Sequence, residues 1–140
     1  MRPESPPRVF VYGTLRPGGR NAALAARFGM PQAQAATLSA FRLLHLSPEN
    51  YPALVPGGPD ERVHGEVLTY PPGVWAQVLP LLDALEGVGE TPPLYHRHRV
   101  NVTSMTGDVE EVWTYLYASA ARLALPGVVP VPGGDWFQRP

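Results

Sequence analysis

Arg8–Arg20 reads R-V-F-V-Y-G-T-L-R-P-G-G-R, which is a strand pattern followed by a glycine-rich loop. The β-branched and aromatic residues up to Tyr12 predict a short buried strand. Asn21 then stands where an N-cap would, ahead of the apolar segment Ala22–Phe28. This part of the chain is therefore predicted to fold as strand, glycine loop and helix.

Strand patterns dominate the rest of the chain. They occupy Thr37–Leu46, Val63–Tyr70, His96–Thr103 and Val109–Tyr117. Turn residues around Gly107 separate the last two, which indicates a hairpin.

One further helix is predicted between Gly73 and Leu85, where apolar residues recur at helical spacing. Pro80 within this segment predicts a kink or a restart. Gly87 has the position of a C′ residue, which ends a helix.

Composition and pattern together predict one α+β domain over residues 1–140. The chain is 44% hydrophobic and 16% charged, and a domain of this size buries roughly two thirds of its unfolded surface. We expect a small, mainly antiparallel, barrel-like sheet flanked by two main helices. Trp136 and Phe137 predict that the Pro/Gly-rich tail packs back onto this domain.

The charge balance bears on possible partners. A formal net charge of −1 without a basic cluster argues against a nucleic-acid or anionic-membrane partner. Met1–Arg8 lacks the apolar core of a signal peptide, and no run has the length of a membrane span. We expect a cytoplasmic protein that acts on a small molecule.

Two residue types are missing from the chain, and their absence limits its chemistry. All 11 basic residues are Arg, so neither a Schiff base nor a phosphate-loop lysine is possible. With 0 Cys, thiol nucleophiles, disulfides and thiolate metal sites are excluded as well. Carboxylates, histidines, hydroxyls and backbone N–H groups remain.

The loop Gly13–Arg20 has three readings. It resembles a phosphate-binding loop in its glycine spacing, but Gly19 and Arg20 stand where that motif needs Lys and Ser/Thr. It can also be a tight turn without function. Alternatively, the backbone N–H groups after Tyr12 point into a cavity and hold a carboxylate, since glycine permits close approach.

The side chains of His96 and His98 point the same way on a predicted strand, as in many metal sites. No third ligand shows a characteristic spacing, and Val100 and Val102 share the face. Sheet packing is therefore favoured and no metal is expected. The chain also lacks the G-x-S-x-G motif of a serine nucleophile.

Glu86 is the most promising acid. It follows the apolar helix in L-D-A-L-E-G, at the negative end of the helix dipole and beside buried leucines. Both influences raise the pKa of a carboxyl, as proton transfer near neutral pH requires. The alternative is an ordinary solvated glutamate, while Asp83, one turn earlier, is expected to be structural.

Several motifs, taken in order, resemble those of the γ-glutamylcyclotransferase-like family, in particular its AIG2-like and γ-glutamylamine cyclotransferase branch. They are Y-G-T-L (Tyr12–Leu15), Y-P-A-L (Tyr51–Leu54), V-H-G-E-V (Val63–Val67), L-D-A-L-E-G (Leu82–Gly87), Y-H-R (Tyr95–Arg97), V-N-V (Val100–Val102), W-T-Y (Trp113–Tyr115) and G-D-W (Gly134–Trp136).

The resemblance implies a small barrel with a cavity at one end and an enzyme that cyclises a γ-glutamyl group to 5-oxoproline without cofactor or metal. It places the catalytic acid/base at Glu86. The substrate-binding residues would be Tyr12, Gly13, Thr14, Leu15 and Tyr95.

One departure from the family pattern is the roomy stretch Val88–Leu94, which lies at the expected cavity mouth and leaves the amine product open. Two alternatives to the enzyme also stay open. The chain could be a catalytically silent relative that binds a small metabolite, or an interaction module.

Overall fold

A computed structural model describes residues 7–139. Residues 1–6, which belong to the segment expected to lack a signal peptide, and residue 140 lie outside this range. The strands are β1 (Arg8–Val11), β2 (Gln32–Ser39), β3 (Phe41–Leu46), β4 (Tyr51–Pro56), β5 (Arg62–Thr69), β6 (Tyr95–Ser104), β7 (Val109–Tyr117) and β8 (Val128–Pro130). The helices are α1 (Ala22–Ala25), α2 (Val74–Leu85), α3 (Ala120–Leu123) and the short 3-10 turns η1 (Pro132–Gly134) and η2 (Trp136–Gln138).

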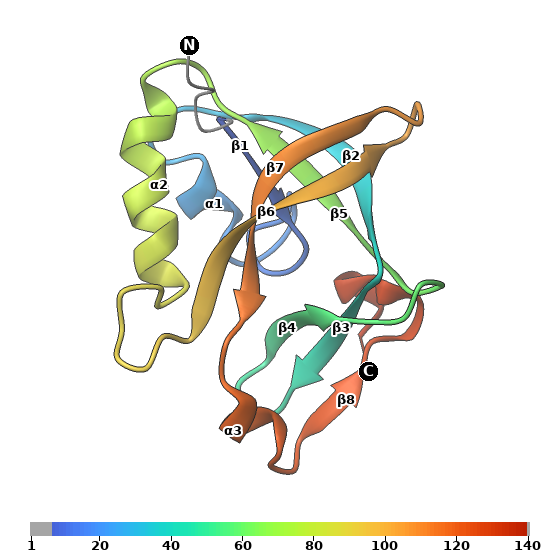
Figure 1. Ribbon diagram of the computed structural model, residues 1–140. Coiled ribbons are helices and arrows are strands. Elements are labelled where there is room, and N and C mark those ends of the chain that lie inside the picture. The colour runs from blue at the N-terminus through green and yellow to red at the C-terminus, as the bar shows by residue number, and fades with distance from the viewer. Residues whose placement is uncertain (1–6, 140) are drawn as a thin grey trace.

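Five strands form a closed barrel in the order β1-β5-β2-β6-β7, and a separate sheet has the order β4-β3-β8. Neighbouring strands of the barrel are antiparallel except β1 and β7, which pair in parallel through Val9 and Trp113. Figure 1 shows α2 along one side of the barrel and the three-stranded sheet below it. The predicted α+β class with a barrel-like sheet is confirmed.

The prediction of one strand over Thr37–Leu46 is wrong, because the chain turns at Ala40. Ala40 has a φ of 64°, and its N–H donates to the carbonyl oxygen of Glu61 over 2.8 Å. The residues before it form β2 in the barrel, and those after it form β3 in the second sheet. Alanine is an unusual residue at positive φ, so the sequence carries no turn signal there.

The prediction of two main helices needs correction. Among the described residues only α2, with 12 residues, exceeds one turn, whereas α1 has 4. Phe28 lies beyond α1 and is 43% exposed, and the Asn21 side chain makes no cap hydrogen bond. Helix α2 runs through Pro80 as one element.

Two apolar clusters form the core. One fills the barrel and reaches the second sheet, and it includes Phe10, Val112 and Trp136. The other lies between the barrel and α2 and includes Val78 and Leu82. Trp136 is 2% exposed, which confirms that the tail packs back. The second cluster fixes the last turn of α2, and with it the position of the residue that follows.

Candidate active site

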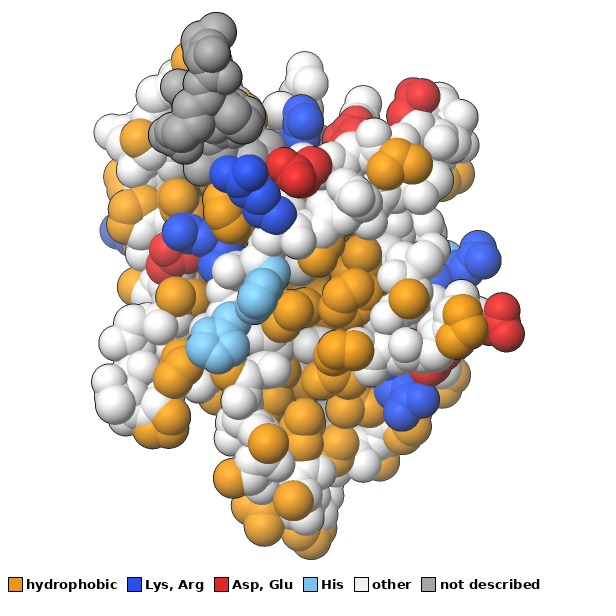
Figure 2. Space-filling view, viewed as in Figure 1, with side chains coloured by type: hydrophobic (Ala, Val, Ile, Leu, Met, Phe, Trp, Pro, Cys, Tyr) orange, Lys and Arg blue, Asp and Glu red, His pale blue; other side chains and the backbone are white. Residues whose placement is uncertain are grey.

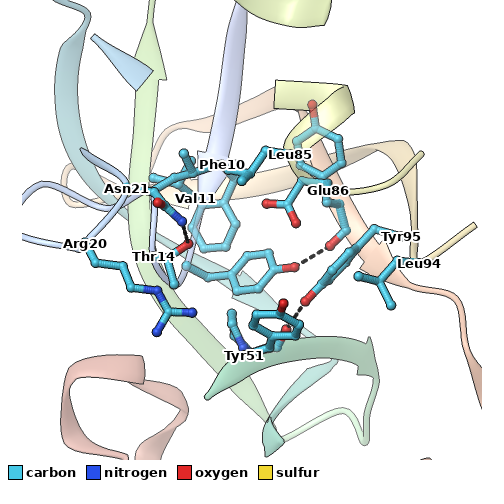
Figure 3. A pocket seen from close by; sticks show the side chains of 15 residues that line it. Phe10, Val11, Thr14, Arg20, Asn21, Tyr51, Leu85, Glu86, Leu94 and Tyr95 are labelled. Atoms are coloured by element: carbon cyan, nitrogen blue, oxygen red, sulfur yellow. Dashed lines mark hydrogen bonds between the residues drawn. The ribbon is translucent and has the colours of Figure 1, made fainter. Parts of the chain in front are cut away.

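A pocket opens where the loop after β1, the end of α2 and the beginnings of β4 and β6 meet (Figure 3). Its volume is about 90 Å³. One water molecule needs roughly 10–15 Å³ of such volume, so the pocket has room for several non-hydrogen atoms, about as many as a glutamyl group contains. It is lined by Phe10, Val11, Tyr12, Gly13, Thr14, Leu15, Arg20, Asn21, Tyr51, Pro52, Leu85, Glu86, Leu94, Tyr95 and Tyr115. All six predicted catalytic and substrate-binding residues are in this set.

The loop after β1 is held close to the start of β4. A Cβ atom on Gly13 would lie 2.4 Å from Cγ of Pro52, so only glycine fits there without displacing β4. Asn21 closes the loop from the other end: its N–H donates to the carbonyl oxygen of Thr14 over 2.8 Å, and its Nδ2 donates to Oγ1 of Thr14 over 3.0 Å. The asparagine predicted as a helix cap therefore braces the loop.

The amides of this loop are available to a ligand. Within residues 7–139, the N–H groups of Gly13, Thr14 and Leu15 donate to no backbone carbonyl outside the regular elements and to no side chain. Buried N–H groups are normally paired, and all three residues line the pocket. A carboxylate bound in the pocket could accept from them.

Glu86 is the C-cap of α2. Its N–H donates to the carbonyl oxygen of Leu82 over 3.0 Å, and Gly87 has a φ of 66°, which confirms the predicted helix end. The carboxylate points into the pocket (Figure 3). Glu86 keeps some solvent exposure, yet desolvation raises the pKa of its carboxyl from 4.5 to about 7. No hydrogen bond or neighbouring charge contributes to this shift.

Tyrosines form the walls around Glu86. The hydroxyl of Tyr12 donates to the carbonyl oxygen of Tyr115 over 2.6 Å, and that of Tyr95 donates to the carbonyl oxygen of Pro52 over 2.5 Å. Burial raises the pKa of the Tyr12, Tyr95 and Tyr115 hydroxyls well above the ordinary value. These phenols are therefore neutral and structural, and they do not compete with Glu86 for protons near pH 7.

Asp83 anchors the last turn of α2 to the barrel. Its carboxylate accepts from the Tyr115 hydroxyl over 2.8 Å and from Nη1 of Arg97 over 2.7 Å. The prediction that Asp83 is structural is confirmed. Because Asp83 lies one turn before Glu86, these contacts also hold the catalytic candidate in place.

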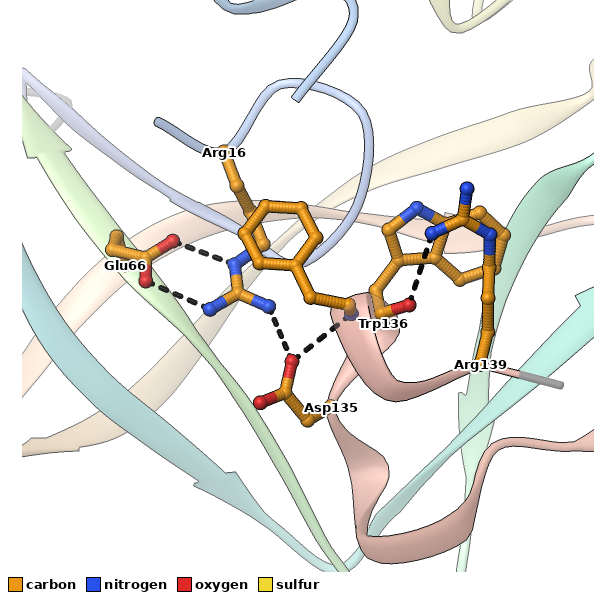
Figure 4. A network of polar contacts seen from close by, with 6 residues as sticks. Arg16, Glu66, Asp135, Trp136 and Arg139 are labelled. Atoms are coloured by element: carbon orange, nitrogen blue, oxygen red, sulfur yellow. Dashed lines mark hydrogen bonds and ion pairs between the residues drawn. The ribbon is translucent and has the colours of Figure 1, made fainter. Parts of the chain in front are cut away.

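A buried arginine in the loop after β1 ties this loop to β5 and to the tail (Figure 4). Arg16 donates to both carboxylate oxygens of Glu66 over 2.7 and 2.9 Å, and to Oδ1 of Asp135 over 2.7 Å. The ring of Phe137 lies 4.1 Å from the guanidinium carbon. The G-E strand motif and the G-D-W tail motif thus meet at one cation, a contact that their separation in sequence conceals.

The sequence argued against metal, nucleic-acid and membrane binding. Within residues 7–139, no group of three or more His, Asp or Glu side chains is arranged to hold a metal ion, and no helix has the length and hydrophobicity to cross a bilayer. His96 and His98 are exposed, with ring centroids 6.1 Å apart. On the face shown in Figure 2, basic side chains are dispersed among acidic and apolar ones.

Nine of the residues that line the pocket were not predicted as site residues, and four of them have polar side chains: Arg20, Asn21, Tyr51 and Tyr115. Tyr51 and Tyr115 belong to motifs already noted, Y-P-A-L and W-T-Y, but nothing in these motifs assigns them to a site. An interaction module would be favoured by an exposed apolar patch formed by the tail and the Leu94–Tyr95 region, but Tyr95 is only 3% exposed.

Comparisons with known proteins give a consistent picture. Residues 9–138 match the family model described as gamma-glutamyl cyclotransferase, AIG2-like. A protein from Arabidopsis thaliana with a known solution structure is 30% identical, with a TM-score of 0.60 over 82% of this chain and 72% of its own. An AIG2-like protein from Mus musculus is 26% identical, with a TM-score of 0.63 over 89% of this chain and 86% of its own.

A protein named gamma-glutamyl cyclotransferase is 20% identical, with a TM-score of 0.63 over 89% of this chain and 71% of its own, and is similar in fold. No curated protein sequence matches the chain significantly.

Proposed function

This chain belongs to the AIG2-like γ-glutamyl cyclotransferase family, and we propose that it converts a γ-glutamyl group into 5-oxoproline with release of an amine or amino acid. In this proposal Glu86 is the general acid/base. The observation that carries it is that the desolvated Glu86 carboxyl and the glycine loop Tyr12–Leu15 line one pocket.

The reaction needs one group that moves protons. The substrate α-ammonium has a pKa of about 8, and the Glu86 carboxylate accepts its proton. The free amine attacks the γ-carbonyl carbon, which forms the ring C–N bond. Glu86 then returns this proton to the nitrogen of the leaving amine as the original amide bond breaks. The ring nitrogen still carries a second proton after the attack, and Glu86 takes it and passes it to the released amine, which departs as an ammonium ion. The enzyme thus ends in its starting state. Of the groups around Glu86, the tyrosines are neutral phenols, and the Asp83 carboxylate is already bonded to Tyr115 and Arg97.

The loop after β1 would position the substrate. Amides of Gly13, Thr14 and Leu15 would hold the α-carboxylate and turn the glutamyl chain so that its amine faces its own γ-carbonyl. Such an intramolecular attack depends mainly on orientation. This accounts for amide cleavage by a chain that has neither Cys nor Lys.

The test is 5-oxoproline release from a panel of γ-glutamyl amines, γ-glutamyl amino acids and glutathione. Glu86→Gln should lower turnover at least about a hundredfold, since a positioned acid/base contributes 10² to 10⁴ in rate. Glu90→Gln is the matched control, because Glu90 is an exposed glutamate outside the pocket. A folded Glu86→Gln protein with near wild-type turnover would refute the proposal. Substrate binding without any turnover by the wild type would identify a silent relative instead.

A further inference from the structure

The pocket has a buried floor and an exposed rim. The floor includes Tyr12 and Tyr95, with exposures of 6% and 3%. Three lining residues are exposed, namely Arg20, Tyr51 and Leu85. Figure 3 shows the Arg20 guanidinium on the side of the pocket away from the Glu86 carboxylate.

The charge of Arg20 is not used within the described part of the chain. Its Nη2 donates to the backbone carbonyl oxygen of Asn50 over 3.1 Å, and no carboxylate of residues 7–139 forms an ion pair with it. Glu49, one residue before Asn50, is already bonded to Arg122 over 2.5 and 2.9 Å. Among residues 7–139, Arg20 is also the only cationic side chain that lines the pocket.

The enclosed space is small, and this decides which part of a substrate meets the rim. With about 90 Å³, the pocket holds roughly one glutamyl group. In the proposed function the glutamyl α-carboxylate binds the loop amides on the inner side. The leaving amine must therefore extend across the rim, where it meets Arg20 and Tyr51.

We infer that Arg20 binds a carboxylate carried by the leaving amine, so that the enzyme prefers γ-glutamyl amino acids to γ-glutamyl amines without a carboxylate. This inference rests on the proposed function. A guanidinium forms charge-assisted, often bidentate hydrogen bonds with a carboxylate. The hydrogen bond from Nη2 to Asn50 leaves Nε and Nη1 of Arg20 free and holds the guanidinium at the pocket rim.

The experiment uses two substrates that differ only in this carboxylate: γ-glutamylalanine and γ-glutamylethylamide. For each protein, kcat/KM is measured by 5-oxoproline release. The wild type should favour γ-glutamylalanine, and Arg20→Gln should lower the ratio of the two values about 5- to 30-fold, as for a charge-assisted contact at an exposed position. Arg20→Lys should keep part of the preference. Arg27→Gln, at an exposed arginine outside the pocket, should keep all of it.

A second readout does not depend on turnover. Calorimetric binding of both compounds to Glu86→Gln, with and without Arg20→Gln, should show the same preference and its loss. If Arg20→Gln weakens the binding of both compounds equally, Arg20 either contacts the α-carboxylate or has a structural role, and the inference is overturned. An unchanged ratio of the two kcat/KM values would overturn it as well. If γ-glutamylalanine still binds preferentially through Arg20 but no 5-oxoproline forms, the proposed function fails and the Arg20 contact stands. If neither compound binds, both are overturned.

Discussion

Replacing Glu86 with Gln should stabilise the protein at neutral and alkaline pH, and the gain should disappear towards pH 4. Desolvation raises the pKa of this carboxyl from 4.5 to about 7 on folding. Between these values the folded state binds more protons than the unfolded state, so the free energy of unfolding of the wild type falls as pH rises. The stabilising contribution of the protonated acid is complete below pH 4.5 and is lost as pH passes through about 7.

The size of the effect follows from the shift. One pKa unit corresponds to about 1.36 kcal/mol, so the shift from 4.5 to about 7 sets an upper limit of roughly 3 kcal/mol above pH 7. Glu86 keeps some solvent exposure, and we therefore expect about 1.5–3 kcal/mol. Gln keeps the shape of the side chain and does not titrate.

Urea unfolding of both proteins from about pH 4 to about pH 8.5 measures the difference. It should grow with pH and level off above about 7. Any cost of burying the Gln amide is the same at every pH, so it shifts the plot of the stability difference against pH without changing its slope. Glu90→Gln, at the exposed neighbouring glutamate, is the matched substitution measured alongside. A difference for Glu86→Gln that does not change with pH would show that the carboxyl is not desolvated in the folded protein.

Two further outcomes are expected. Prolonged chelator treatment should leave 5-oxoproline release unchanged, because the proposed mechanism uses only Glu86 for proton transfer; loss of activity that zinc or manganese restores would contradict this mechanism. Arg16→Ala should lower the free energy of unfolding by roughly 2–4 kcal/mol, since the side chain is 8% exposed and its removal leaves two carboxylates facing each other without their cation. Urea unfolding measures the loss, and a change below about 0.5 kcal/mol, as for an ordinary surface position, would mean that the tail is held by Trp136.

Much of the local structure could be predicted because it depends on residues close together in sequence. Alternating apolar residues indicated the strands β5, β6 and β7, and the helical spacing before Gly87 indicated α2 with its end. The position of Glu86 directly after that helix suggested a raised pKa, and the direction is confirmed. The cause, however, is burial in the pocket, since the neighbouring Leu85 is 40% exposed. The Y-G-T-L motif marked the loop in the same way.

Other features depended on contacts between distant segments, which no local pattern contains. Ala40 turns the chain at a positive φ without a turn residue, because Glu61 accepts its N–H. The Asn21 side chain, which was expected to cap a helix, donates instead to Oγ1 of Thr14, because the loop doubles back on itself.

The arrangement of the site likewise belongs to the tertiary structure. The sequence determined which chemical groups the chain has, namely one promising acid, a glycine loop and arginines in place of lysines. It did not determine that Arg20 would stand at the pocket rim while Arg16, four residues earlier, lies buried between two carboxylates. The packing of the second sheet and of α2 against the barrel brings β4, the loop after β1 and the end of α2 together. Only that packing gives each arginine its partners and Glu86 its desolvated position.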